Sequence, residues 1–281
     1  MVAGRRLLAA LVATLACLLA AAGSAAAASW VNLGDSYTAG PLIPNQLPPY
    51  GCLKSDHNFS HLAAAELEYS LTDVSCSGAK TDDMTQAQGV TPGPNPPQFD
   101  GLAAGTDVVT LEIGGNDIGF TDIIRNCATY NPFAHPCQDT YVHGTDDEIS
   151  NRINATAPKV ATVLSGIHSR SPSARVFVVN YAAILPETGF GCWPTMPLAY
   201  ADVPYLRAKE KELNAMLASQ AASGGATLVD DYTASIGHDS CTLPGTRWVE
   251  PIAPASPAAP VHPNALGMAG VATVVAAAVG H

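Results

Sequence analysis

Five short runs of β-branched and other apolar residues recur along the chain, with stretches of helical pattern between them. The runs cover residues 30–33, 70–76, 107–113, 175–180 and 226–230. Strands that are apolar along most of their length and alternate with helices are typical of a parallel sheet buried on both faces. This order predicts an α/β fold, a three-layer α/β/α sandwich with helices on both sides of one sheet.

Four longer helices complete the expected pattern. They are expected over residues 60–69, after the capping box Thr145-Asp146-Asp147-Glu148, from Asp202 to Gly224, and after Pro263. Pro158 lies inside the second of these helices and should kink it, because proline lacks a backbone donor and clashes with the preceding turn. No repeat or break in composition divides residues 29–281, so we expect them to form one domain.

The first 28 residues have the features of a cleavable secretory signal. Arg5 and Arg6 precede an apolar run over residues 7–22, and alanine-rich sequence leads to Ser29. This pattern is typical of a signal peptide rather than of a membrane-spanning helix. We therefore expect a secreted, extracellular protein that is a monomer and has no stable membrane anchor.

Acidic residues outnumber basic ones in this chain. It has 13 Lys and Arg against 24 Asp and Glu, a formal net charge of −11. Cleavage of the signal would remove two arginines and leave −13. Nucleic acids and anionic membranes carry negative charge themselves, so neither is expected as a standing partner.

Six cysteines follow the signal segment, an even number in a chain expected to be exported. They are Cys52, Cys76, Cys127, Cys137, Cys192 and Cys241. Disulfides are the expected state, and six cysteines allow 15 pairings. Cys127 and Cys137 bracket a short loop, which favours their mutual pairing. The spacing leaves the other pairs open, with Cys52–Cys76 and Cys192–Cys241 as our assignment. A metal site is the alternative, but no Cys-x-x-Cys or His-x-x-x-His pattern supports one.

Four short motifs stand at the ends of predicted strands or near the C-terminus. They are Gly34-Asp35-Ser36, Cys76-Ser77-Gly78-Ala79, Gly114-Gly115-Asn116-Asp117 and His262-Pro263-Asn264. Each has an ordinary explanation on its own, since Asp or Ser can cap a helix and Gly or Asn favours turns. The first three, however, follow the first three predicted strands in order. Open α/β sheets bind ligands at the carboxyl ends of their strands, so this order favours one shared site.

With these motifs the chain resembles the GDSL or SGNH hydrolase family, over almost all of residues 29–281. The resemblance implies the SGNH-hydrolase fold, with a flavodoxin-like parallel sheet in the order 2-1-3-4-5. Within the family, the chain is most similar to secreted actinomycete-type esterases, lipases and phospholipases with three disulfides. The resemblance also implies that Ser36 is the nucleophile and His262 the catalytic base. The oxyanion hole would consist of the Ser36 and Gly78 N–H groups and the Asn116 side-chain amide.

The chemistry of acyl transfer assigns the same roles. A serine hydroxyl is a weak nucleophile until an imidazole accepts its proton, and the tetrahedral oxyanion that follows requires preorganised donors. His262 is preferred among the histidines because the proline-rich residues 251–260 lead rigidly into it and a helix follows. Asp35 and Asp117 are expected to make structural hydrogen bonds rather than to take part in catalysis.

The residue that orients His262 is less usual. Many family members have an Asp three residues before the catalytic His, where this chain has Ala259. The resemblance suggests that a main-chain carbonyl, of Ala259 or Pro260, orients the ring instead, which makes a Ser–His dyad with a neutral partner. The other carboxylates that could serve are Asp230, Asp231 and Asp239.

We therefore expect hydrolysis of carboxylic esters, of lipid or short-chain acyl type, through an acyl-Ser36 intermediate without metal or organic cofactor. The acyl groove is expected between four long loops, residues 41–51, 89–101, 126–144 and 186–200. A carbohydrate acetyl esterase would use the same dyad and is the alternative enzyme. A secreted binding protein on this fold is the alternative from another class, but it would not need all four motifs. An α/β-hydrolase is disfavoured because Thr38 replaces the second glycine of Gly-x-Ser-x-Gly.

Overall fold

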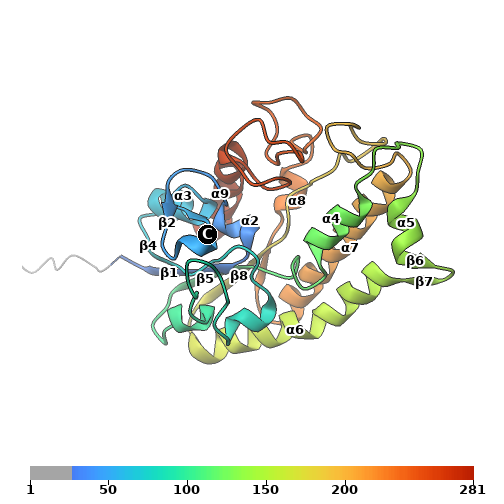
Figure 1. Ribbon diagram of the computed structural model, residues 1–281. Coiled ribbons are helices and arrows are strands. Elements are labelled where there is room, and N and C mark those ends of the chain that lie inside the picture. Colours follow the sequence, from blue (N-terminus) through green and yellow to red (C-terminus); the bar gives the residue numbers. More distant parts are fainter. Residues whose placement is uncertain (1–26) are drawn as a thin grey trace, which may run out of the picture.

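The computed structural model describes residues 27–281, so most of the expected signal segment, residues 1–28, lies outside the described residues. A central sheet of five parallel strands runs through the molecule (Figure 1). The strands are β1 (Ser29–Gly34), β4 (Ser70–Asp73), β5 (Val108–Glu112), β8 (Arg175–Val179) and β9 (Thr227–Val229). They lie in the order β4-β1-β5-β8-β9 and every neighbouring pair is parallel. The predicted strand order 2-1-3-4-5 is confirmed.

Helices cover both faces of the sheet. On one face lie α3 (Phe59–Glu66) and α9 (Ala265–Val279), and on the other α6 (Glu148–Arg170) and α7 (Asp202–Ser223). The three-layer sandwich that the sequence predicts is therefore confirmed.

The strands separate two hydrophobic cores by the alternation of their side chains. Along β5, Val108 packs with the helices α3 and α9, whereas its neighbour Val109 packs with α6 and α7. Phe177 and Val178 divide in the same way along β8. Successive side chains of a strand point to opposite faces, so a strand buried on both faces must be apolar almost throughout. This explains the continuous apolar runs in the sequence.

The start of α6 differs from the expectation. Thr145 is not the N-cap: the helix begins at Glu148, and Asp147 caps it by accepting a hydrogen bond from the Ser150 N–H at 3.1 Å. Asp146 and Asp147 form the short strand β7 (Asp146–Asp147), which pairs with β6 (Val142–His143) and keeps the chain extended up to the cap. This local hairpin places the N-cap two residues after Thr145.

The two prolines assigned to helices lie in different settings. Pro158 is inside α6, which continues through it as one helix. Pro263 lies outside α9, because Asn264 is the N-cap and its side chain accepts a hydrogen bond from the Gly267 N–H at 2.9 Å. The helix expected after Pro263 is present and begins two residues later, at Ala265.

Shorter elements lie in the connections. They are α2 (Ser36–Ala39), α4 (Phe120–Cys127), α5 (Pro136–Tyr141), α8 (Asp231–Ala234), the antiparallel pair β2 (Gln46–Leu47) and β3 (Lys54–Ser55), and 3-10 helices over Tyr50–Cys52, Thr81–Met84 and Gln98–Gly101. Within residues 27–281, no helix combines the length and the apolar character needed to cross a membrane.

Three disulfides join these connections. Cys52 pairs with Cys76, Cys127 with Cys137, and Cys192 with Cys241. All three assigned pairings are confirmed. The first links the loop after β1 to the end of β4, the second joins α4 to α5, and the third joins the loops that follow β8 and α8.

Candidate active site

Ser36 and His262 meet at the carboxyl end of β1, although 226 positions separate them in the sequence. Ser36 is the first residue of α2, and its Oγ lies 2.7 Å from His262 Nε2. The other ring nitrogen, Nδ1, lies 2.8 Å from the carbonyl oxygen of Pro260. A carbonyl only accepts, so Nδ1 must carry the ring proton and Nε2 offers its lone pair to the Ser36 hydroxyl. Burial lowers the pKa of His262 below its ordinary value, and the Pro260 hydrogen bond opposes part of that effect.

The structure separates the two candidate carbonyls. Pro260 faces the ring, whereas the Ala259 carbonyl accepts the backbone N–H of His262 at 3.2 Å. Of the two carbonyls that were expected to orient the ring, that of Pro260 does so, and that of Ala259 supports the turn instead.

The three alternative carboxylates are engaged elsewhere or turned away. Asp230 accepts hydrogen bonds from Asn180 and Thr233, and Asp239 accepts one from the Cys241 N–H. Asp231 is buried at the start of α8. Within residues 27–281, none of the three makes a hydrogen bond to His262.

The backbone before Ser36 leaves no room for a side chain at position 34. A Cβ on Gly34 would lie 2.9 Å from the Glu112 carbonyl oxygen and closer still to the Thr38 side chain. The Asp35 side chain then caps α2 by accepting the Tyr37 N–H at 2.9 Å. The Ser36 N–H is left without an acceptor among the described residues, as first-turn N–H groups of helices commonly are.

Asn116 lines the same groove as Ser36, and it is bonded to the turn that carries Gly78. Gly78 has φ +81° in an exposed turn, and no acceptor for its N–H is found within residues 27–281. Asn116 donates one amide hydrogen to the Ala79 carbonyl at 3.0 Å, which holds the amide and leaves its second hydrogen available.

Asp117 joins the two turns that carry these donors. Its carboxylate accepts hydrogen bonds from the N–H and the hydroxyl of Thr81, and Lys159 Nζ lies 3.6 Å away. The structural role expected for Asp117 matches these contacts.

Tyr181 is a site residue that the sequence reasoning missed. It follows β8, is buried, and its hydroxyl donates to Asp35 Oδ2 at 2.6 Å while it accepts the Gly115 N–H at 2.8 Å. One phenol oxygen therefore connects the turn before Ser36 to the turn before Asn116. The Asn214 side chain on α7 holds the backbone of Tyr181: it donates to the Tyr181 carbonyl at 2.9 Å and accepts the Tyr181 N–H at 3.0 Å. The position of Tyr181 at the carboxyl end of β8 is the signal that could have identified this residue.

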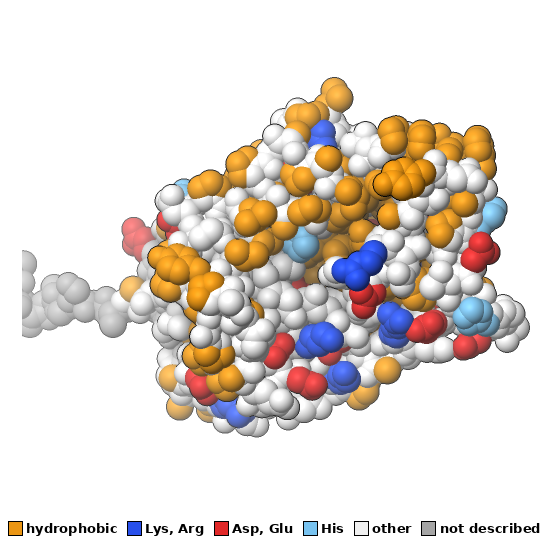
Figure 2. Space-filling model, in the orientation of Figure 1, with side chains coloured by type: hydrophobic (Ala, Val, Ile, Leu, Met, Phe, Trp, Pro, Cys, Tyr) orange, Lys and Arg blue, Asp and Glu red, His pale blue; other side chains and the backbone are white. Residues whose placement is uncertain are grey.

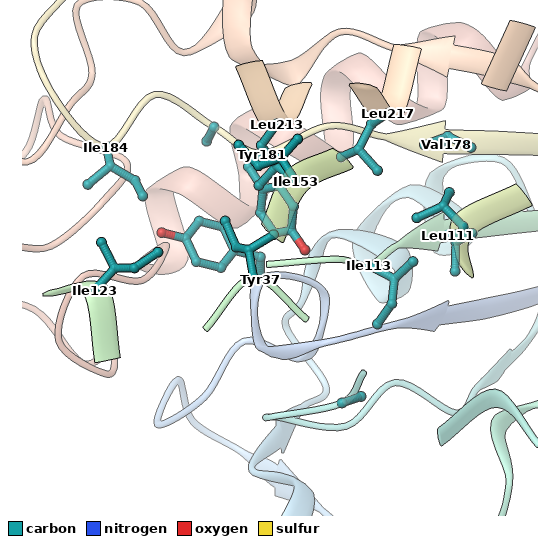
Figure 3. Packing of buried hydrophobic residues seen from close by; sticks show 14 of the residues in the cluster. Tyr37, Leu111, Ile113, Ile123, Ile153, Val178, Tyr181, Ile184, Leu213 and Leu217 are labelled. Atoms are coloured by element: carbon teal, nitrogen blue, oxygen red, sulfur yellow. The ribbon is translucent and has the colours of Figure 1, made fainter. Parts of the chain in front are cut away.

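Tyr37 makes the corresponding connection to the histidine. Its hydroxyl donates to the Val261 carbonyl at 2.8 Å, and its ring centroid lies 5.1 Å from that of His262. The Tyr37 and Tyr181 rings pack edge to face, and Figure 3 shows them among buried aliphatic side chains such as Ile123 and Leu213. Tyr37, the residue after Ser36, thus supports the loop that carries His262.

Asp35 is a buried carboxyl beside the nucleophile. Burial raises its pKa to about 7, while the hydrogen bonds from Tyr181 and Tyr37 oppose the rise. Burial also raises the pKa of Glu112, whose carboxyl accepts a hydrogen bond from the Thr38 hydroxyl. The hydrogen bonds that Asp35 accepts from Tyr37 and Tyr181 match the structural role expected for this residue.

An apolar groove lined in part by Ser36 is open to solvent, and its space including the open mouth is about 750 Å³. Figure 2 shows a hollow lined by hydrophobic side chains on this face of the molecule. The walls include Phe120, Ile123 and Ile124 from α4, Ile149 from α6, Leu206 and Leu213 from α7, and Ile184, Leu185 and Leu198 from the segment after β8. The expectation that four long loops form these walls is wrong for three of them, because helices supply most of the lining.

Besides Asp35, the groove lining includes the ionisable side chains of Lys209 and Glu210. Burial raises the pKa of Glu210 to about 8, so this carboxyl is mostly protonated and uncharged at neutral pH. Lys209 is neutralised by Asp147, 2.7 Å from its Nζ, and by Glu212 at 3.0 Å. The lining therefore suits an apolar chain rather than an ionic one.

The residues that meet in this site all lie inside one family match. Residues 33–269 match the GDSL-like Lipase/Acylhydrolase family. The chain belongs to this family. Lipase 2 of Streptomyces coelicolor is 42% identical over 245 residues, which cover 85% of this chain and 81% of that protein.

Solved structures agree with this membership. Phospholipase A1 from Streptomyces albidoflavus superposes with a TM-score of 0.75 at 25% identity, covering 90% of this chain and 99% of that one. The extracellular lipase of Streptomyces rimosus gives a TM-score of 0.74 at 26% identity, covering 90% of this chain and 100% of that one. The family match and these relatives identify the chain as a carboxylic ester hydrolase of the GDSL family.

Proposed function

We propose that this GDSL hydrolase is an exported lipolytic esterase that cleaves esters of apolar acyl chains with a Ser36–His262 dyad. The observation that carries the proposal is the 2.7 Å contact between Ser36 Oγ and His262 Nε2 at one end of an apolar groove. The sequence pattern of residues 1–28 supports export, as does the similarity to the extracellular lipase of Streptomyces rimosus.

The proposed first step is proton transfer from Ser36 to His262. As Ser36 Oγ attacks the ester carbonyl, Nε2 takes the hydroxyl proton, and Nδ1–H remains bonded to the Pro260 carbonyl. The carbonyl keeps the ring in the tautomer that accepts the proton. It stabilises the imidazolium less than a carboxylate would, because it carries only a partial charge.

The tetrahedral oxyanion is proposed to bind three donors. These are the N–H groups of Ser36 and Gly78, which lack other acceptors within residues 27–281, and the free amide hydrogen of Asn116. Loss of one such donor typically costs about 3 kcal/mol of transition-state stabilisation. Collapse of the intermediate expels the alcohol, which receives its proton from His262. Water then attacks the acyl-Ser36 ester by the same route and regenerates Ser36.

The acyl chain is proposed to occupy the groove. The lining is almost entirely aliphatic or aromatic, so each methylene buried there would contribute about 0.8 kcal/mol. This contribution corresponds to about a fourfold gain in kcat/KM per methylene until the groove is full.

A chain-length panel tests this proposal. The substrates are soluble nitrophenyl esters from acetyl to decanoyl, with acetylated xylan beside them. The enzyme should prefer the longer acyl chains. Ile124→Trp should remove that preference while the acetyl ester is cleaved as before, because Ile124 lines the groove and is only partly buried. Ile124→Val is the matched control and should keep the preference.

Two results would contradict the proposal. A preference for the acetyl ester and acetylated xylan would identify a carbohydrate acetyl esterase instead. A chain-length profile unchanged by Ile124→Trp would show that the acyl chain lies elsewhere.

A further inference from the structure

Four large hydrophobic side chains are far more exposed than is usual for their type. Tyr130 is 99% exposed, Leu243 77%, Phe133 76% and Phe190 64%. Tyr130 and Phe133 lie between α4 and α5, Phe190 lies in the loop after β8, and Leu243 in the loop after α8. We call these residues the exposed apolar rim. Contiguous exposed apolar groups commonly mark a binding surface, whereas single ones need no explanation.

Contacts between the three loops show that the rim belongs to one surface. The Thr129 N–H donates to the Pro197 carbonyl at 2.7 Å, and the Phe133 ring packs edge-on against Tyr200 at 5.7 Å. The Cys192–Cys241 disulfide ties the loop of Phe190 to the loop of Leu243. The rim residues are thus held on neighbouring segments rather than scattered over the molecule.

The same loops adjoin the acyl groove. Leu198 lines the groove and forms a β-bridge with Ala128, at the start of the rim segment between α4 and α5. Ile184 also lines the groove, and its carbonyl accepts the Ser240 N–H in the loop of Leu243. Figure 2 shows hydrophobic side chains that extend from the hollow over the loops beside α5 in Figure 1.

Charge is absent from these loop segments although the chain is strongly acidic. Residues 126–138, 188–201 and 240–246 contain no Asp, Glu, Lys or Arg, while the whole chain has a formal net charge of −11. Charged side chains would hold water at the surface and oppose its burial. Charged residues stand only outside the ends of these segments, and Arg207 on α7 donates to the Gly189 carbonyl beside Phe190. The segments that carry the exposed rings are themselves free of charge, which favours their desolvation.

We propose that the exposed apolar rim docks the enzyme on an uncharged lipid–water interface, such as a phosphatidylcholine bilayer, and brings the groove against the lipid. Tyrosine favours this interface because it combines an apolar ring with a polar hydroxyl, and phenylalanine and leucine side chains can enter the apolar layer beneath the headgroups. Anionic lipids attract Lys and Arg, and residues 126–138, 188–201 and 240–246 contain neither. The inference rests on the proposed lipolytic function, since docking would place lipid acyl chains at the groove.

A polysaccharide is the less suitable occupant. Sugar rings also stack on aromatic side chains, but their hydroxyl groups call for dense hydrogen-bonding partners. The rim offers phenylalanine and leucine together with tyrosine, and no ionised side chain within its loop segments. Binding to acetylated xylan is therefore an outcome that the test must measure.

The test is cosedimentation of the inactive Ser36→Ala protein with phosphatidylcholine vesicles. We expect Ser36→Ala to bind, and Tyr130→Ser/Phe190→Ser in the same background to partition about tenfold more weakly, because two interfacial rings are lost. Tyr50→Ser is the matched control: Tyr50 is 58% exposed but lies outside the three loops, so its loss should leave binding unchanged. Vesicles with added phosphatidylglycerol should bind less protein than phosphatidylcholine alone.

The active enzyme separates this inference from the proposed function. Tyr130→Ser/Phe190→Ser should hydrolyse a soluble monomeric ester with the kcat/KM of the parent and lose activity only on vesicles. The inference is overturned if the parent does not sediment, if the double variant binds as well as the parent, or if acetylated xylan or phosphatidylglycerol vesicles are preferred. An absence of hydrolysis of every soluble ester would instead refute the proposed function.

Discussion

His262 has a neutral partner at each ring nitrogen, the Ser36 hydroxyl at Nε2 and the Pro260 carbonyl at Nδ1. In a triad, an Asp would stabilise the protonated ring, but here burial acts against protonation and lowers the pKa of His262. The residue is therefore held in its neutral, proton-accepting form over a wider pH range than a free imidazole.

This environment predicts the acid limb of the pH profile. The proposed mechanism requires neutral His262, so kcat/KM should fall as pH drops through its pKa, and the midpoint should lie below the ordinary value of 6.5. The measurement is kcat/KM on a soluble ester between pH 4 and 9. Asp35→Asn should lower activity without moving this midpoint. A midpoint near 7 that disappears in Asp35→Asn would assign the limb to Asp35, whose pKa burial raises to about 7.

Tyr181 gives a second prediction for a single residue. Tyr181→Phe removes the hydroxyl that connects Asp35 to the Gly115 N–H, so the turns of Ser36 and Asn116 lose their common support. We expect kcat to fall about tenfold with little change in KM, and stability to fall by about 1–3 kcal/mol. The pKa of Asp35 should rise further, because the Tyr181 hydrogen bond lowers it.

Tyr141→Phe is the control for that variant. Tyr141 is also buried and accepts a hydrogen bond from Asn126 at 3.0 Å, but it does not line the groove. Its loss should lower stability and leave kcat unchanged. Equal effects of both substitutions on kcat would mean that Tyr181 serves stability alone and does not position the oxyanion donors.

At the scale of elements, the site depends on connections that hold the strand ends. Gly78 lies two residues after Cys76, and its turn is tied to the loop after β1 by the Cys52–Cys76 disulfide and by the Ser77 N–H, which donates to the Cys52 carbonyl. The Cys192–Cys241 disulfide joins loops at the outer side of the groove instead. The two bridges should therefore differ in what their removal affects.

Paired substitutions test this difference. Cys52→Ser/Cys76→Ser opens a bridge that spans 24 positions, which should lower the free energy of unfolding by about 3 kcal/mol and also lower kcat through Gly78. Cys192→Ser/Cys241→Ser opens a bridge that spans 49 positions, and it should lower the free energy of unfolding by at least the same amount. The kcat of this variant on a short soluble ester should be unchanged. Thermal unfolding and kcat are measured on both variants. An unchanged kcat in the first would mean that its bridge does not position Gly78.

At the scale of the whole molecule, the sequence predicted a parallel sheet with helices on both faces, because buried parallel strands are apolar along their length. The resemblance to the family supplied the order of the strands. The four motifs proposed to form the site were locatable because each stands at a strand end or in a rigid loop. The walls of the groove were not, since Ile124, Ile149 and Leu213 show only ordinary helical patterning and meet through tertiary packing. Tyr181 escaped notice for a similar reason: its partner Asp35 lies 146 positions away.

The orientation of His262 shows where sequence reasoning reaches its limit. Ala259 and Pro260 both lie close before the histidine, and nothing in their residue types decides which carbonyl faces the ring. The turn geometry decides it, because the Ala259 carbonyl is taken by the His262 N–H and Pro260 is left for Nδ1. A backbone orienter carries no side-chain signature.

The central claim is that Ser36, activated by His262, forms the acyl-enzyme. The most direct measurement is reaction of the folded protein with a fluorophosphonate, followed by mass spectrometry to locate the adduct and by assay of ester turnover. We predict a single adduct on Ser36 with proportional loss of turnover, strongly slowed labelling in His262→Ala, and neither labelling nor turnover in Ser36→Ala. An adduct on another residue, or undiminished turnover by Ser36→Ala, would contradict the account.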